Sequence, residues 1–405
     1  LSVKQIGESS VYKYHRWIES AFATNMPYDR FATELLTARG STLVNPPANF
    51  YRTAANRDDS VETSAQIFLG TRIQCAKCHN HPFERWTQDN YYGMASFFNR
   101  IQRRRTGKGD ETWVYDAKSG EVTHPLNGKT MKPWVPIAGE MDLTPGTDRR
   151  LEFTRWLTKP NNPFFAQVEV NRLWAQVMGR GIVEPFDDFR DTNPPSNAPL
   201  LDALTSDFVK SGYDRRHALR VILNSRTYQA NSRAVPLNRD DRKYFSHYTA
   251  RMLSAEQLLD AIGQVTGIPE RLKGLPPDMK CTQVPAPELA NVDFLKIFGQ
   301  PERQSVCECD RSDEGSLERA LQLYNGRLLD RRLKDGSNRF RRMLAAGKSD
   351  DEITRDLYLS ALCREPTIAE LKIVRAHVSA RKDRTLALEN ILWALLNKTE
   401  FLFQH

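Results

Sequence analysis

Two cysteines and two histidines stand close together in the stretch TRIQCAKCHNHPFERW, residues 71–86. The whole chain has 6 Cys and 8 His among 405 residues. A C-x-x-C-H string would then arise by chance about 0.002 times, so the spacing is specific. Thiols and imidazoles placed in this way attach haem, bind a metal ion or form a disulfide.

Haem attachment explains every residue of the C-x-x-C-H string. Thiols one helical turn apart, here Cys75 and Cys78, reach the two vinyl groups of one porphyrin. His79 follows as the proximal axial ligand of the iron. His81, two residues further on, cannot cross to the opposite face of the same ring. We interpret it as a supporting residue that hydrogen-bonds a propionate or orients the proximal side. The spacing predicts one covalent haem c.

Two other chemistries remain open for the same residues. A zinc site needs a second ligand pair, which the CECD string at 307–310 could supply together with His81, although that spacing is not a standard one. The second alternative is a disulfide between Cys75 and Cys78.

The sixth iron ligand must come from elsewhere in the chain. His124, within GEVTHPLNG, is one candidate; Met94 and His15, both in predicted helices, are two others. A vacant sixth position is the fourth option. Two strong ligands favour electron transfer, whereas an open iron permits ligand binding or peroxide chemistry.

Four cysteines are left after haem attachment, namely Cys281, Cys307, Cys309 and Cys363. We favour disulfides that join Cys307 and Cys309 to Cys281 or Cys363 in an oxidising compartment, with a second metal or redox site as the alternative. The acidic stretch 184–197 lacks the regular ligand alternation of a calcium loop, and we interpret it as a capped turn.

The elements that position these residues are predicted to be mostly α-helical. Helices are expected at 9–25, 27–39, 60–75 and 87–101, the third leading directly into the cysteines and the fourth capped by Thr87. We predict a helical haem-binding region at 1–110, a small β-hairpin or meander at 111–146, and a larger helical C-terminal domain at 147–405 with a long loop at 266–314. Capping boxes begin helices at Ser254, Ser349 and Thr367.

Composition restricts the class of protein further. The formal net charge is +8, and part of it lies in the basic run 99–109, which we interpret as a solvated loop. Docking of an acidic electron-transfer partner is the alternative for that run. No nucleic-acid signature accompanies it, and no apolar run is long enough to span a membrane. Because the chain starts at Leu1, we expect a processed or incomplete polypeptide.

The whole chain resembles the planctomycete-type cytochrome c proteins, in which a cytochrome-like region precedes the Planctomycetes-specific PSD domain. The resemblance rests on blocks such as IQCAKCHNHPFERWTQDNYYGMASFF, NRLWAQVMGRGIVEPFDDFRDTNPPSN and FGQPERQSVCECDRSDEG. It implies an exported haem protein, periplasmic or extracellular, and leaves the reaction open.

Electron transfer, or oxidoreductase chemistry supported by the haem, is therefore the expected function, with an acidic redox protein as partner. One alternative is an oxidoreductase that acts on a saccharide and passes electrons to haem. The other is a structural or assembly component, a homo-oligomer or larger assembly, in which haem stabilises the fold. No Ser/His/Asp order, P-loop or dinucleotide fingerprint indicates another enzyme class.

Overall fold

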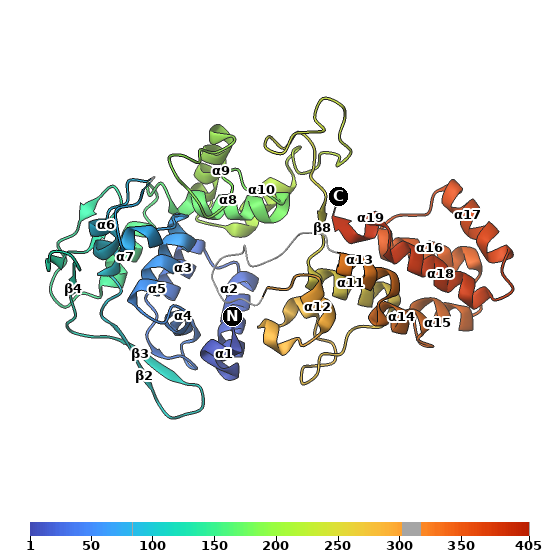
Figure 1. Ribbon diagram of the computed structural model, residues 1–405, viewed down its shortest axis with the longest axis horizontal. Coiled ribbons are helices and arrows are strands. Elements are labelled where there is room, and N and C mark those ends of the chain that lie inside the picture. The colour runs from blue at the N-terminus through green and yellow to red at the C-terminus, as the bar shows by residue number, and fades with distance from the viewer. Residues whose placement is uncertain (83, 302–316, 405) are drawn as a thin grey trace. The chain divides into compact units, whose positions relative to one another are not determined.

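The computed structural model describes residues 1–82, 84–301 and 317–404 (Figure 1). The described chain is mostly helical, and its sheets are small antiparallel ones of two or three strands. This confirms the fold class predicted from the sequence. The chain divides into two compact units, one containing Val3–Thr249 and the other beginning at Ala250.

The first unit contains ten α-helices, three shorter helical turns and seven strands among its described residues. The α-helices are α1 (Val3–Ile6), α2 (Glu8–Ala23), α3 (Tyr28–Leu36), α4 (Phe50–Thr53), α5 (Arg57–Ser64), α6 (Gln88–Ala95), α7 (Arg149–Leu157), α8 (Phe165–Met178), α9 (Ala198–Lys210) and α10 (Arg215–Leu223). The short turns are η1 (Pro46–Asn49), η2 (Ala65–Leu69) and η3 (Gln74–Lys77). The strands are β1 (Gly40–Ser41), β2 (Ile101–Arg105), β3 (Thr112–Asp116), β4 (Val122–Thr123), β5 (Thr130–Met131), β6 (Trp134–Val135) and β7 (Gly139–Glu140).

The second unit contains nine α-helices among its described residues, together with two short turns and one pair of strands. The helices are α11 (Ala255–Thr266), α12 (Asp293–Ile297), α13 (Leu317–Asn325), α14 (Arg327–Lys334), α15 (Arg339–Ala345), α16 (Asp350–Leu362), α17 (Ile368–Ser379), α18 (Arg384–Leu396) and α19 (Thr399–Leu402). The turns are η4 (Cys281–Gln283) and η5 (Pro287–Leu289), and β8 (Arg251–Met252) pairs with β9 (Phe403–Gln404).

Aromatic packing ties the helices after residue 146 to the N-terminal elements. Tyr28 of α3 stacks on Phe165 of α8 at 4.7 Å between ring centroids, and Phe68 of η2 lies beside the same ring at 6.1 Å. Helices α7–α10 therefore complete the core of the first unit. By its contacts the first unit extends to Thr249, past residue 146, where the sequence analysis began the C-terminal domain.

The second unit has its own hydrophobic core, which the C-terminal helices supply. Leu258, Leu357 and Leu392 are fully buried within one cluster. The capping boxes predicted at Ser254, Ser349 and Thr367 are all present. Local capping chemistry is thus a reliable signal here, because each box uses residues only three positions apart.

The basic run 99–109 differs from the predicted solvated loop. Its centre, residues 101–105, forms strand β2, which pairs along its full length with β3, while β1 pairs with the other edge of β3. Apolar burial explains the strand, because Ile101 and Val114 face the interior of the unit. In Figure 1 the two strands form a hairpin that extends beyond the helices of this unit. The pairs β4–β5 and β6–β7 confirm the predicted small β segment.

Candidate functional site

The predicted helix over 60–75 ends before the cysteines. Helix α5 begins at Arg57, where the Asn56 side chain accepts a hydrogen bond from the Asp59 amide, and continues as the wider turn η2 up to Leu69. Gly70 then takes a left-handed φ of 61°. A Cβ on Gly70 would lie 2.6 Å from a Phe189 ring carbon, so glycine is required at this close approach. The prediction of one continuous helix into the motif was therefore wrong.

The cysteine motif lies instead on a short 3-10 turn, η3, that α6 holds in place. Two side chains of α6 bond the Lys77 carbonyl, which accepts from Gln88 Nε2 at 2.9 Å and from the Tyr92 hydroxyl at 3.2 Å. Asn80 Oδ1 accepts from the Gln88 amide at 3.0 Å. Thr87 caps α6 as predicted, and Asn90 completes a capping box with it. The start of α6 thus fixes the backbone of the motif.

Cys75 and Cys78 are exposed free thiols, so they form no disulfide with each other. His79 follows them and is also exposed. Its Nδ1 lies 2.7 Å from the Asn80 carbonyl oxygen. Because a carbonyl only accepts, Nδ1 carries the proton in this contact, and Nε2 keeps its lone pair for a metal. Metal-ligating histidines are usually oriented by such a bond. The three residues therefore fit covalent haem.

His81 lies beside the motif and is partly buried. Its backbone amide donates to the Trp86 carbonyl at 2.8 Å, which closes the loop that follows His79. Trp86 packs edge-to-face with Trp134 of β6, with ring centroids 6.3 Å apart. The residues after the motif are thus anchored to the aromatic surface of the small β segment.

The structure brings His124 close to the motif. The His124 imidazole packs edge-to-face on Tyr92, with centroids 5.6 Å apart. Its Nδ1 accepts from the Leu126 amide at 3.2 Å, and its Nε2 lies 3.4 Å from Asp89 Oδ1. Nε2 therefore carries the proton, which is the tautomer opposite to that of His79. His124 would have to release Asp89 before it could bind iron.

The other two candidates for the sixth ligand lie in helices. Met94 is 1% exposed within α6 and packs in the core. His15 lies half-buried on α2, where burial lowers its pKa. The contacts of these two side chains give neither of them a link to His79.

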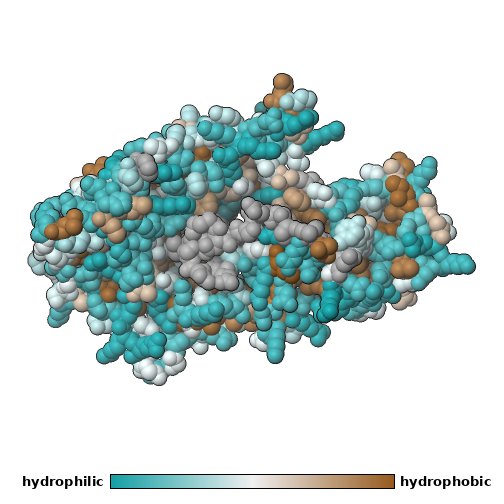
Figure 2. Space-filling model, viewed as in Figure 1, coloured by the Kyte–Doolittle hydropathy of each residue, from teal (hydrophilic) through white to brown (hydrophobic). Residues whose placement is uncertain are grey.

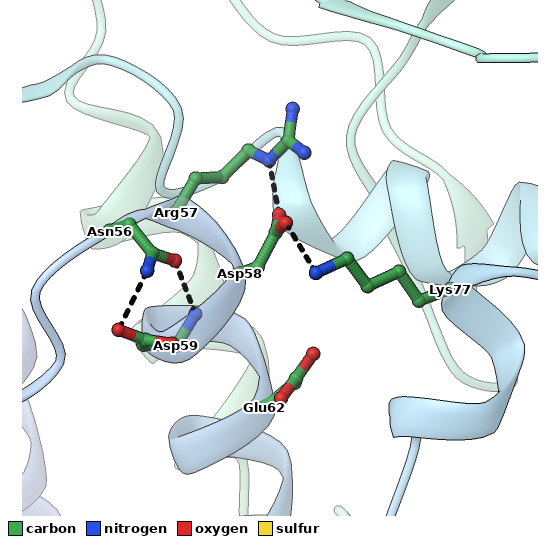
Figure 3. Close-up of a pocket in the computed structure, with 6 residues that line it drawn as sticks. All are labelled: Asn56, Arg57, Asp58, Asp59, Glu62 and Lys77. Carbon is green, nitrogen blue, oxygen red and sulfur yellow. Dashed lines mark hydrogen bonds and ion pairs between the residues drawn. The ribbon is translucent and has the colours of Figure 1, made fainter.

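A polar pocket that sequence reasoning missed opens beside the motif (Figure 3). Its volume is about 280 Å³. This is slightly below the roughly 300–1,000 Å³ typical of drug-sized sites, so the pocket suits a small polar group rather than a porphyrin. It is lined by Asn56, Arg57, Asp58, Asp59, Glu62 and Lys77. The available signal was a run of polar residues in RDDSVE together with a lysine between the two cysteines.

Charges in the pocket are arranged around Asp58. Its carboxylate lies 2.7 Å from Arg57 Nε and 3.0 Å from Lys77 Nζ. Burial opposes ionisation of Asp58, but the hydrogen bonds from Arg57 and Lys77 outweigh it and lower the pKa of this carboxyl. Glu62 accepts from the Tyr91 hydroxyl at 2.8 Å, and burial raises its pKa. Asp58 and Glu62 lie on one face of α5, and Glu62 therefore holds its proton to a higher pH than Asp58 does.

The remaining predicted site residues do not join the motif. Cys281 is a buried free thiol whose pKa burial and Asp260 raise to about 12, so it is unreactive. Cys363 is an exposed free thiol. Cys307 and Cys309 lie outside the described residues. Over 1–82, 84–301 and 317–404, no group of three or more His, Cys, Asp or Glu is placed to hold a metal ion.

Two aspartates of the acidic stretch 184–197 pair with arginines. Asp187 accepts from Arg72 at 2.6 Å and from Gln66 at 2.5 Å, and Asp188 pairs with Arg190 at 2.9 Å. Both aspartates are buried. These pairs tie the stretch to η2 and to the residues just before the cysteine motif, which gives it a structural role.

The fold and the site together define a class: a mostly helical, two-unit protein that carries a C-x-x-C-H turn in its first unit. No helix in the described part of the chain combines the length and apolarity that crossing a membrane requires. The family model PSD1, described as a protein of unknown function (DUF1553), matches residues 149–378, more than half of the chain. The chain belongs to this family.

A second family model, PSCyt2, described as a protein of unknown function (DUF1549), matches residues 3–103 and includes the cysteine motif. The residues between the two matches contain strands β3–β7. No curated protein and no solved structure matches the chain. The two matched models agree with the planctomycete-type domain arrangement that the sequence resembles.

Proposed function

We propose that this protein carries one covalent haem c on Cys75, Cys78 and His79 and acts in electron transfer or haem-supported oxidation and reduction. Haem would supply a one-electron centre whose iron cycles between two oxidation states. The chain itself would hold the ring through two thioethers and one imidazole. His81 would support the proximal side.

The orientation of His79 is the observation that carries the proposal. The bond from Nδ1 to the Asn80 carbonyl leaves Nε2 as the ligand atom. An unrelated surface histidine needs no such arrangement. The two neighbouring cysteines are free and exposed, as thioether formation requires.

Exposure of the motif favours electron transfer over a purely structural haem. Cys75, Cys78 and His79 are all exposed, so a haem attached there would have an edge near the surface of the unit. An acidic redox protein could then exchange electrons at that edge. We further propose that the protein works in the periplasm or outside the cell, in keeping with the resemblance to exported haem proteins.

The test is a pyridine haemochrome spectrum of the full chain produced with a c-type haem maturation system and directed to the periplasm. We expect a c-type band with one haem per chain, resistant to acid–acetone extraction. The double variant Cys75→Ala/Cys78→Ala should lose the covalent haem. Cys363→Ala removes an exposed cysteine in the second unit and serves as the matched control. This variant should keep the covalent haem.

The native spectra then separate the possible roles. A six-coordinate low-spin spectrum supports an electron carrier, whereas a five-coordinate high-spin spectrum supports chemistry at an open iron. A chain that folds without haem and binds zinc stoichiometrically would overturn the proposal.

A further inference from the structure

The hairpin of β2 and β3 presents two aromatic rings and an arginine on one outward face. In this antiparallel pair Gln102 lies opposite Tyr115 and Arg104 opposite Trp113. Directly opposite residues share a face, so these four side chains point to the same side. Trp113 is 45% exposed and Tyr115 is 41% exposed, although large aromatic side chains usually lie buried.

The inner face of the hairpin is firmly anchored. Val114 is fully buried and Ile101 is 5% exposed. The Arg103 guanidinium donates to the backbone carbonyls of Tyr51 and Ala54, the latter at 2.8 Å. The outward face is therefore preformed, and binding there would not have to order the strands.

Positive charge on the hairpin is only partly compensated. Two of its carboxylates are used internally: Glu111 accepts from Thr106 at 2.6 Å and also from Ser41, and Asp110 accepts from the Ser10 amide at 3.0 Å. Arg104, Arg105 and Lys108 are exposed and form no ion pair within 4.0 Å among the described residues, although Lys108 lies near enough to Glu111 to help lower the pKa of that carboxyl. Figure 2 shows the projecting end of the hairpin in teal and white, that is, hydrophilic to neutral.

We propose that this outward face, formed by Gln102, Arg104, Trp113 and Tyr115 with Arg105 and Lys108 at its edge, is a docking surface for an acidic protein. Arginine, tryptophan and tyrosine are the residues that dominate the binding energy of protein interfaces. Arg104 and Arg105, which form no ion pair among the described residues, favour a partner that presents carboxylates. Such docking would serve the proposed electron carrier, but the surface itself does not depend on haem.

A protein partner fits this surface better than a nucleic acid or a sulfated glycan. Polyanion sites track a charged backbone with many cations, and single-stranded nucleic acids use a positively charged groove. Here the face has one arginine between two rings, with two further cations at its edge. Apolar and aromatic contacts must therefore contribute much of the affinity.

The test measures binding of labelled polymers to the full chain by fluorescence anisotropy. A random copolymer of glutamate and tyrosine mimics an acidic protein surface with aromatic side chains, and poly-glutamate mimics its charge alone. Heparin and oligothymidylate represent the other polyanions. We expect the copolymer to bind about tenfold more tightly than poly-glutamate, because buried aromatic contacts carry interface energy.

Variants separate the contributions of rings and charges. Trp113→Ala/Tyr115→Ala should abolish the preference for the copolymer over poly-glutamate. Arg104→Glu/Arg105→Glu should lower the affinity for both polymers about tenfold or more. Arg381→Glu/Lys382→Glu makes the same charge change at exposed positions of the second unit and should have no effect. Circular dichroism checks that each variant is folded.

Three outcomes would overturn the inference. The first is the absence of copolymer binding. The second is a loss of affinity in Arg381→Glu/Lys382→Glu as large as that in Arg104→Glu/Arg105→Glu. The third is binding of heparin or oligothymidylate that is tighter than copolymer binding and depends on Trp113 and Tyr115. None of these measurements requires haem, so failure here is distinguishable from failure of the proposed function.

Discussion

At the residue scale, His79 and His124 differ in which nitrogen carries the proton. The Asn80 carbonyl accepts a hydrogen bond from Nδ1 of His79, while the Leu126 amide donates one to Nδ1 of His124. His79 thus keeps Nε2 available for the proposed iron, whereas both ring nitrogens of His124 are engaged by its neighbours. Sequence position alone does not distinguish the two.

This difference predicts the effect of replacing His124. In the haem-loaded protein, His124→Ala should leave the spin state of the iron unchanged, because Nε2 is turned to Asp89. It should lower the free energy of unfolding by about 1–2 kcal/mol, since a buried hydrogen-bonded ring is lost. Absorption spectra and urea unfolding measure the two effects. Met94→Leu, a volume-conserving change, is the control, and a spin-state change in His124→Ala alone would show that His124 binds iron.

At the element scale, a glycine controls how α6 packs against the β segment. Glycine inside a helix normally costs about 1 kcal/mol relative to alanine, so Gly93→Ala would ordinarily stabilise α6. A Cβ on Gly93, however, would lie 2.5 Å from Trp134 Cβ. We expect Gly93→Ala to destabilise the protein by about 1–3 kcal/mol through overpacking.

Thermal unfolding measures this effect, and the yield of covalent haem reports whether α6 still holds the motif. Gly336→Ala is the control, because nothing lies within 4 Å of the added Cβ. A Gly93→Ala protein as stable as the wild type would show that Trp134 moves away freely.

A charge network fixes α17 to its neighbours in the second unit. Glu370 pairs with Arg364 at 2.9 Å and with Lys398 at 2.9 Å, and Arg364 also pairs with Glu400. The hydrogen bond from Arg364 is the main reason why the pKa of Glu370 lies well below its ordinary value of 4.5. A depressed carboxyl pKa adds stability above the unfolded-state pKa and loses it as pH falls towards the folded-state pKa.

Glu370→Gln should therefore lower the free energy of unfolding by about 1–2 kcal/mol at pH 7, the range for a partly buried network. The difference from wild type should shrink below about pH 4, where the carboxylate is protonated in the unfolded chain. Urea unfolding at several pH values measures this difference in the free energy of unfolding. Glu352 completes a similar capping box on α16 but is more exposed, with 51% of its side chain accessible, so Glu352→Gln should have the smaller effect.

At the scale of the whole molecule, the division into units predicts which fragment folds. The buried residues of the second unit's core all lie at Ala255 or later, and Met252 and Leu253 pack against them. A fragment of residues 250–405 should therefore be helical and unfold cooperatively. The longer fragment 147–405 adds α7–α10 without their partners, which exposes Phe165 and its neighbours. We expect the 147–405 fragment to aggregate. Light scattering and circular dichroism of the two fragments test this expectation. A well-behaved 147–405 fragment with an unfolded 250–405 would contradict the division.

The sequence by itself determined the mostly helical class, the capping boxes at Ser254, Ser349 and Thr367, and the C-x-x-C-H motif. Each of these depends on residues a few positions apart, so a short window contains the whole signal.

The tertiary structure alone decided the end of the helix at Leu69, the strand formed by the basic run and the extent of the first unit. Gly70 ends the helix in a left-handed conformation, and the Phe189 ring lies where a side chain at this position would be. Ile101 joins a strand because Val114 offers it a buried face, and α8 belongs to the first unit because Phe165 stacks on Tyr28. The pocket beside Lys77 likewise needs α5 and η3 to meet. In each case the cause is a contact between residues far apart in the chain, which no local pattern records.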